Sequence, residues 1–437
     1  MGFWSSIFKS SSDSSVLLDS NTVFGRFSGV FKSDSLNEHW EMALSDFEKK
    51  DYHSSFSHVL EYLKNDKGDN VRFQRINDRI EFEIFQGSKS VLGYMDPVHF
   101  YAIAPLAIVE DLNIGLLRKS LEKNYMLQYS RYALNDKLQM SLKFDSVIAE
   151  ASPYKLFYGL KEMAIQADLD DDLIVVDFEN VKPINAEHII AISDKEKELK
   201  SDFFYREIDE VLDPKVLGNL NPDRFQGALT YVYLSCVYKL DFLLKPEGKA
   251  MHQIAKIHAV YSLAGNQDVG LSLGKLTEGL KALKEIEPEK LRSEFYNVIS
   301  TFSVVPPATE TEIGGIIENE MKSFEWYKEQ KHYFICEQIC SYLVGFLLFQ
   351  FAFASPAKDL LHLFYCISEE DFFKSLSIPV DFIDGGELRS ARIKAAIKQI
   401  LEDSNLTDKQ NLMDQLQFET KTHFYQSYLQ FFRQVLA

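Results

Sequence analysis

The hydrophobic residues of the first folded stretch follow a helical period. Between residues 37 and 64 they recur at steps of three and four, first from Trp40 to Phe47 and again from Phe56. Lys50-Asp51 interrupts the pattern. The stretch therefore predicts two helical segments or one long kinked helix.

A period of two replaces the helical period from Val71 onward. Apolar residues alternate with polar ones over 71–84, and turn-forming residues stand at 77–78 and 86–88. The run HFYAIAPLAI, residues 99–108, is a further apolar segment. We predict three strands here, the third of which ends at Pro105.

A helix and a hairpin are predicted next. Residues 115–124 place Leu116, Leu117 and Leu121 on one helix face. The run LEKNYMLQYSRYALNDKLQMSLKF, residues 121–144, indicates the end of that helix and two short strands that turn over Asn135-Asp136.

The next helix has a clear start signal. Ser152 is a favourable N-cap residue, and Pro153 suits the first helical position. The predicted order is therefore helix, three strands, helix, two strands, helix.

The chain after residue 178 lacks this alternation. Residues 179–222 contain prolines and the charged run DKEKELK, and they predict a connection that carries some helix of its own. Apolar residues then recur with helical spacing. We predict an α+β domain over 36–178 and an all-α domain over 223–437, preceded by a flexible tail over 1–35 that is rich in Ser, Asp and Gly.

Composition and charge argue against one class of partner. The 437 residues are 46% hydrophobic and 26% charged, as in ordinary globular proteins. The net charge is −18, and no stripe of Lys and Arg with interleaved aromatic residues is evident. A phosphate backbone requires a concentrated basic face, so we expect no nucleic-acid partner.

Cysteine usage and the N-terminal stretch indicate the cytoplasm. The four cysteines fit a reducing compartment, and none has the CxxC spacing of a structural zinc site. The stretch MGFWSSIFKSSSDSSV lacks the basic and continuous apolar regions of a secretory signal.

Two features keep a membrane-peripheral scaffold as the alternative. The tip MGFWSSIF fits a short myristoylation pattern and carries aromatic residues suited to a membrane surface. Residues 338–357 carry no charge and approach the roughly 20 residues that span a bilayer. Gln338 and Gln350 within this stretch favour a helix buried in a protein core instead.

No sequence pattern predicts catalysis, a metal or a cofactor. DLDDDLIVVDFE, residues 168–179, has carboxylates at calcium-loop positions, but Leu173 stands where that loop needs Gly. GLSLGKLT, residues 270–277, has too few residues between its glycines for a phosphate-binding loop, and Leu276 replaces the required Ser or Thr. We expect no catalytic, metal-binding or cofactor-binding residue and a protein that is not an enzyme.

The element order over 37–178 resembles the type III secretion chaperone-like superfamily, including YbjN-like domains. The similarity is best from HFYAIAPLAIVED at residue 99 to the helix that begins at Pro153. Its landmarks are Ala104-Pro105-Leu106 in the strand, Leu121-Glu122-Lys123-Asn124 at the end of the helix, Arg131, Ala133 and Leu134 in the hairpin, and Ala167-Asp168 in the closing helix.

The resemblance implies a compact bacterial domain with a twisted antiparallel sheet, often dimeric and without enzyme activity. Such a domain holds a protein segment on its sheet, along a sheet edge or in an apolar groove. The middle helix commonly mediates pairing in this family. Leu116, Leu117 and Leu121 are therefore candidate contacts to a partner or a second copy, or they pack on their own sheet. Because secretion chaperones are small single domains, the added helical domain argues against a direct role in secretion.

Overall fold

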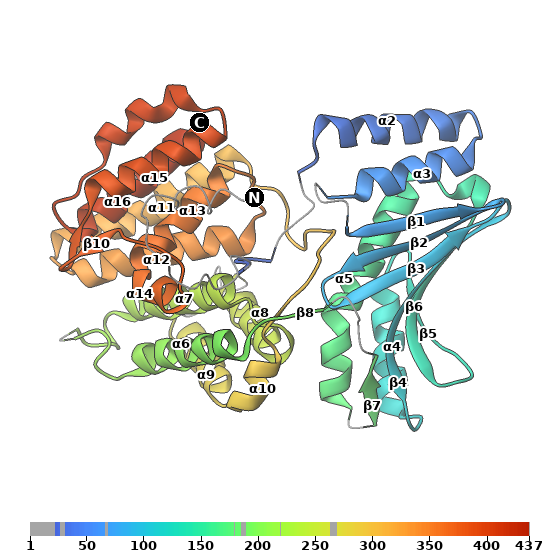
Figure 1. The fold of residues 1–437 in the computed structure, drawn as a ribbon. Coiled ribbons are helices and arrows are strands. Elements are labelled where there is room, and N and C mark those ends of the chain that lie inside the picture. The colour runs from blue at the N-terminus through green and yellow to red at the C-terminus, as the bar shows by residue number, and fades with distance from the viewer. Residues whose placement is uncertain are drawn as a thin grey trace. The chain divides into compact units, whose positions relative to one another are not determined.

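The chain forms two compact units in a computed structural model (Figure 1). The α+β unit contains the described residues of 26–191 and 296–304, and the helical unit contains residues 22–25 and the described residues of 192–295 and 305–436. The α+β class with a helical C-terminal region is confirmed. The residues that the structure describes are 22–26, 31–65, 69–178, 180–184, 189–218, 220–262 and 269–436.

The α+β unit combines a mainly antiparallel meander with helices before, within and after it. Its elements are α2 (Asp34–Glu48), α3 (Tyr52–Leu63), β1 (Val71–Ile76), β2 (Arg79–Gln86), β3 (Lys89–Met95), β4 (His99–Val109), α4 (Ile114–Met126), β5 (Arg131–Leu134), β6 (Gln139–Val147), the 3-10 helix Ile148–Glu150, α5 (Pro153–Asp177), β7 (Val181–Pro183), β8 (Ile190–Ala191) and β9 (Tyr296–Asn297).

The predicted break in the first helical stretch separates α2 from α3. Lys50 takes a left-handed backbone conformation with φ 64°, which ends α2. The Asp51 side chain then accepts a hydrogen bond from the backbone N–H of Ser54 at 3.2 Å and caps α3. Two helices form, rather than one kinked helix.

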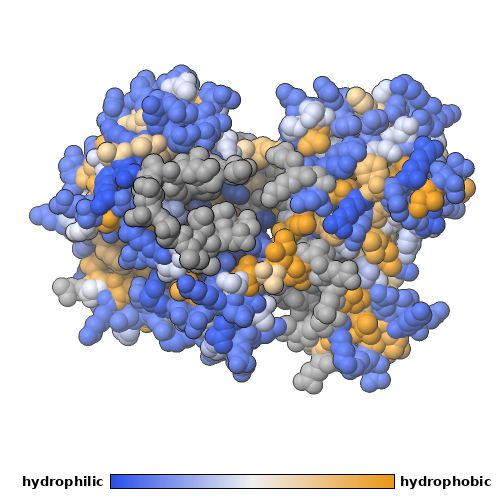
Figure 2. All heavy atoms as spheres, in the orientation of Figure 1, coloured by the Kyte–Doolittle hydropathy of each residue, from blue (hydrophilic) through white to orange (hydrophobic). Residues whose placement is uncertain are grey.

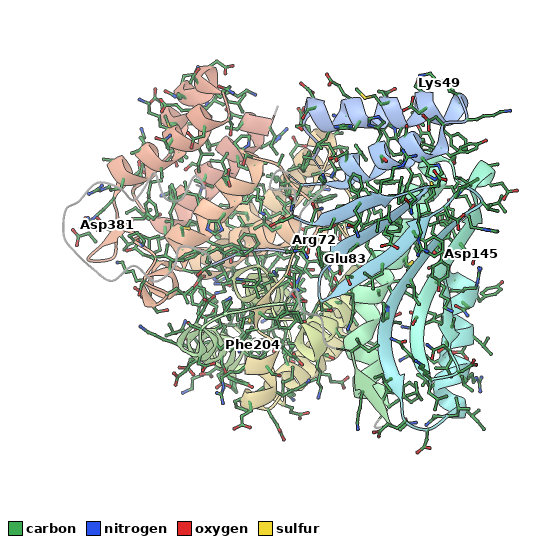
Figure 3. All side chains as sticks on the ribbon, turned by 45° about the vertical axis from the view of Figure 1, so that its right-hand side comes forward. Lys49, Arg72, Glu83, Asp145, Phe204 and Asp381 are labelled. Atoms are coloured by element: carbon green, nitrogen blue, oxygen red, sulfur yellow. The ribbon has the colours of Figure 1, made fainter. Side chains whose placement is uncertain are left out.

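The sheet has the strand order β1-β2-β3-β4-β6-β5, and β7 pairs with β4. The prediction of three strands before α4 is wrong, because four are present. The missed strand is β3, whose alternation is interrupted where Gly93 stands opposite Phe82 and gives no apolar side chain to the pattern. Arg72 and Glu83, labelled in Figure 3, are cross-strand partners of β1 and β2.

Pro105 does not end β4, contrary to the sequence prediction. The register with β6 shifts between Pro105 and Ala107, and the strand continues to Val109. Beyond this irregularity β7 pairs with residues 107–109 of β4. A bulge thus absorbs the proline within the strand.

One face of the sheet is covered by helices and holds the core of the α+β unit. The Phe56 ring of α3 packs against Phe82 and Phe100, with ring centroids 5.3 and 5.4 Å apart. Phe100 in turn lies 5.3 Å from Phe144 of β6. Leu156, Leu160 and Met163 of α5 complete this core, as the predicted helical stripe required.

A segment from the second half of the chain completes the α+β unit. The Gln86 side chain accepts from the backbone N–H of Phe302 at 2.8 Å and donates to its carbonyl at 3.4 Å. Asn70 donates to the Thr301 hydroxyl at 3.1 Å. The Phe302 side chain is buried in the core, so the all-α region predicted from residue 223 does not form one uninterrupted domain.

The helical unit begins earlier than predicted. Phe204, labelled in Figure 3, and Ile208 of α6 are fully buried in its core, although they fall within the predicted connection. Its elements are α6 (Asp194–Leu212), α7 (Gln226–Leu244), α8 (Gly248–Ser262), α9 (Val269–Lys284), α10 (Pro288–Ser293), α11 (Glu310–Glu329), α12 (Tyr333–Gln350), α13 (Ala357–Ser368), α14 (Glu370–Ser375), β10 (Ile383–Asp384), β11 (Glu387–Leu388), α15 (Ser390–Asp403), the 3-10 helix Thr407–Gln415 and α16 (Lys421–Leu436).

Two glycines in helices of this unit should respond oppositely to the same substitution. A Cβ at Gly345 of α12 would lie 2.6 Å from Cβ of Tyr238 in α7, whereas a Cβ at Gly315 of α11 would meet nothing within 4 Å. We expect Gly345→Ala to lower the free energy of unfolding by about 1–3 kcal/mol through overpacking. Gly315→Ala should raise it by roughly 0.5–1 kcal/mol through helix propensity. Urea unfolding measures both, and equal effects would contradict the close approach of α7 and α12.

Candidate protein-interaction surface

Helix α4 begins at a well-capped N-terminus. The Asn113 side-chain oxygen accepts hydrogen bonds from the backbone N–H of Gly115 at 2.7 Å and of Leu116 at 3.4 Å. Asparagine is among the strongest N-cap residues because it satisfies N–H groups that have no intrahelical partner. The helix therefore starts at Ile114, one residue before the predicted stretch.

The inner side of α4 is fixed to its own unit. Leu116 is 2% exposed and belongs to the core. Lys123 forms an ion pair with the buried Asp170 of α5, which also accepts from the Tyr132 hydroxyl. The Asn124 side chain accepts from the backbone N–H of Tyr132 at 2.6 Å and donates to its carbonyl at 3.3 Å. These contacts leave α4 little freedom to rotate about its axis.

A single carboxylate holds the loop after α4. Glu162 of α5 accepts hydrogen bonds from the backbone N–H groups of Gln128, Tyr129 and Ser130 at 2.7–2.9 Å. The Ser130 hydroxyl donates to the same carboxylate at 2.9 Å. The position of α4 is thus set from both its inner face and its C-terminal end.

The outer side of α4 carries an exposed apolar stripe. Ile114 is 84% exposed, Leu121 69% and Tyr125 90%, and Leu117 is also exposed. These four residues follow helical spacing and form what we call the α4 surface. Figure 2 shows further apolar side chains exposed in the lower half of the α+β unit. A stripe of this kind on a fixed helix is typical of a protein-interaction surface.

The three leucines predicted from sequence separate into two groups. Leu117 and Leu121 lie on the α4 surface, but Leu116 packs on its own sheet and is not accessible to a partner. Sequence reasoning missed Ile114 and Tyr125, the most exposed members of the stripe. The spacing 114, 117, 121, 125 was visible in the sequence, but spacing alone does not tell which side of a helix faces the core.

The uncovered face of the sheet is a weaker candidate. Leu92 and Ile103 are cross-strand neighbours there, as are Tyr94 and Tyr101. The Arg79 guanidinium lies 3.8 Å from the Tyr94 ring centroid and covers it. Leu92 is 40% exposed, close to the 38% of Leu117 but well below the values for Leu121 and Tyr125. The sheet face is therefore less exposed than the part of the α4 surface formed by Ile114, Leu121 and Tyr125.

The acidic stretch that follows Ala167 forms part of helix α5 instead of a calcium loop. Asp168 accepts from the backbone N–H of Ser88 at 2.8 Å, and Asp170 pairs with Lys123. Both carboxylates are therefore already bound by donors of the α+β unit itself. Glu179, the last position of the pattern, lies outside the described residues. GLSLGKLT, residues 270–277, likewise lies entirely within helix α9 (Val269–Lys284).

The helical unit buries charged groups that could suggest an active site. Lys239 of α7 pairs with Glu207 of α6 and, at 3.0 Å, with Glu369 after α13. Burial disfavours the charged form of Lys239, but the carboxylates of Glu369 and Glu207 outweigh burial and raise its pKa above the ordinary value. The ammonium is therefore held in its charged form by two core carboxylates and is a poor candidate for a base or nucleophile.

The cysteines and the apolar helix also belong to this core. All four cysteines are buried thiols. Among the described helices, α12 is long and apolar enough to cross a membrane by length and composition, and most of its residues are buried against other helices. This burial favours the core-helix interpretation of the 338–357 stretch over insertion. The MGFWSSIF tip lies outside the described residues.

Comparison with known proteins gives no family for this chain. No protein-family model matches it, and no curated protein matches it.

We expect Glu162→Gln to loosen the loop after α4, because an amide nitrogen cannot accept the hydrogen bonds that the carboxylate oxygens accept. Unfolding free energy should fall by about 1–3 kcal/mol. Amide hydrogen exchange at Gln128, Tyr129 and Ser130 should become faster. Glu48→Gln, at an exposed position at the end of α2, is the matched control. Unchanged exchange in the Glu162 variant would refute this role.

His362 of α13 should make the helical unit sensitive to acid. Burial, together with the positive charge of Lys358, lowers the pKa of His362 to about 3. Below pH 6.5 the unfolded chain takes up a proton here that the folded chain does not, so stability is lost as pH falls. Relative to His362→Phe, the wild type should lose about 2 kcal/mol of unfolding free energy between pH 7 and 5. Urea unfolding at each pH tests this, with His423→Phe as control, and parallel pH profiles for wild type and His362→Phe would contradict it.

Proposed function

We propose that this chain is a non-enzymatic, cytoplasmic protein-binding module of chaperone-like type, whose α4 surface binds a second protein chain. One observation carries the proposal, namely the apolar stripe that a firmly anchored helix presents to solvent. Burying such a stripe releases water from apolar surface at little conformational cost, because the helix is already ordered.

The charge pattern beside the stripe favours a second copy of the same chain as the occupant. Arg118 and Glu122 form an exposed ion pair at 3.0 Å along one flank of the α4 surface. Suppose two α4 helices pack antiparallel about a two-fold axis near Lys119 and Ser120. Ile114 of each copy then lies opposite Tyr125 of the other, and Arg118 lies beside Glu122 of the other.

This arrangement is self-complementary in both apolar and charged contacts. The stripe residues 114, 117 and 121 follow the spacing of a helix-pairing seam. Opposite charges meet on the same flank of the pair, so the ion pair within one helix gains a partner from the second copy. We infer a homodimer built on α4, in agreement with what the resemblance to chaperone-like domains implies. A held protein segment would then lie on surfaces that this pairing leaves open, such as the sheet face.

Leu121→Asp should abolish self-association, because it places a charge at the centre of the paired helices. The dimer dissociation constant should rise by at least about 100-fold, as expected from losing two buried leucines and burying two unpaired charges. Sedimentation equilibrium of the full chain over a range of concentrations measures this. Tyr158→Asp, on the outer surface of α5, is the control.

Charge reversal provides an independent check on the antiparallel pairing. Arg118→Glu alone should weaken the dimer about 3–10-fold, because it converts attraction into repulsion at two symmetric positions. Adding Glu122→Arg should restore the wild-type value. A wild-type chain that stays monomeric at high concentration contradicts the second copy as occupant, and failure of the double variant to recover contradicts the antiparallel register.

A further inference from the structure

A short N-terminal segment is bound by the helical unit before the chain enters the α+β unit. By their contacts the described residues 22–25 belong to the helical unit, whereas Arg26 already belongs to the α+β unit. Phe24 is half-buried, while its neighbour Val23 is exposed. The segment therefore attaches through one inward-pointing aromatic side chain.

Three aromatic rings from three helices receive Phe24. Its ring centroid lies 4.8 Å from that of His362 in α13, 5.2 Å from Phe373 in α14 and 6.5 Å from Phe242 in α7. Each of these rings is itself buried, and they also contact one another, with His362 5.6 Å from Phe242 and 5.5 Å from Phe373. We call His362, Phe242 and Phe373 the aromatic site.

The backbone of the segment also donates a hydrogen bond to a carbonyl at the end of α7 that has no donor within its own helix. The Phe242 carbonyl would normally accept from the N–H four residues later, but that residue is Pro246, which has no N–H. The backbone N–H of Gly25 donates to this carbonyl at 3.0 Å. One hydrogen bond therefore satisfies an acceptor that α7 cannot satisfy itself.

The position after Phe24 requires glycine. Gly25 has φ +71°, which other residues rarely adopt. A Cβ there would also lie 2.9 Å from the Phe242 ring. The aromatic site thus contacts an aromatic side chain, accepts a hydrogen bond from the N–H of the next residue and leaves no room for a side chain on that residue. These three requirements together specify an aromatic residue followed by glycine.

We propose that the aromatic site is a peptide-recognition site for a protein segment carrying an aromatic residue followed by glycine, and that Phe24-Gly25 occupies it as a displaceable intramolecular ligand. One half-buried ring and one hydrogen bond favour the bound over the released segment by a factor on the order of 10–10². A short tether raises the effective concentration of the segment to roughly millimolar. An external segment below millimolar concentration therefore binds only when it makes further contacts or when Phe24 is withdrawn. This site is separate from the α4 surface and does not depend on it.

Binding of a synthetic peptide to the full chain tests the proposal. The probe is a fluorescein-labelled, terminally blocked peptide of residues 21–26, NTVFGR, and fluorescence polarisation measures its affinity. Phe24→Ala empties the site in cis, so the variant should bind the probe at least about 10-fold more tightly than the wild type. Phe31→Ala, which removes an exposed phenylalanine of the α+β unit, should behave like the wild type. A probe with Ala in place of Phe should not bind any of the three chains.

A folded Phe24→Ala chain that binds the probe no better than the wild type would overturn the proposal, because the contact would then be passive packing. A second measurement avoids dependence on the folding of that variant. The full chain with 4-fluorophenylalanine at position 24 is titrated with millimolar unlabelled NTVFGR. Displacement should move the fluorine resonance to its solvent-exposed position, whereas an unchanged resonance would show that the segment is not displaceable.

Discussion

The packing of Phe56 against Phe82 and Phe100 decides which face of the sheet lies inside the α+β unit. Side chains alternate along a strand, so this contact commits every second residue of β2 and β4 to the core and the others to the opposite face. Helices α3 and α5 then cover the inner face. Phe302, from far along the chain, completes the same core, and its backbone is held by Gln86.

The orientation of α4 follows from this arrangement. Asp170 and Glu162 project from α5, the helix that covers the sheet, and they bind Lys123 and the loop after α4. Since these polar contacts fix the inner side of α4, its apolar outer stripe cannot turn inward. A stripe that stays exposed for this reason is preorganised for a partner, because binding orders no further backbone.

The helical unit buries charged side chains and the end of a helix, and both are satisfied by contacts within the unit. Lys239 pairs with both Glu207 and Glu369 within the core. At the end of α7, Pro246 leaves the Phe242 carbonyl without a donor from its own helix, and Gly25 supplies one. The contacts of Lys239 are explained by charge pairing within the core. The hydrogen bond from Gly25 instead ties the N-terminal segment to the end of α7.

Local pattern was sufficient for the helices and strands with strong periodicity. The capped start of α5, the helical period of residues 37–64 and the hairpin at Asn135-Asp136 follow from spacing and turn residues that act over a few positions. It was insufficient where distant groups decide the outcome. Only the tertiary structure showed that β4 continues through Pro105, that residues 296–304 return to the α+β unit, and that Leu116 faces inward while Leu121 faces solvent. The sequence determines which residues share a helix face, but the contacts of Lys123 and Asn124 determine where that face points.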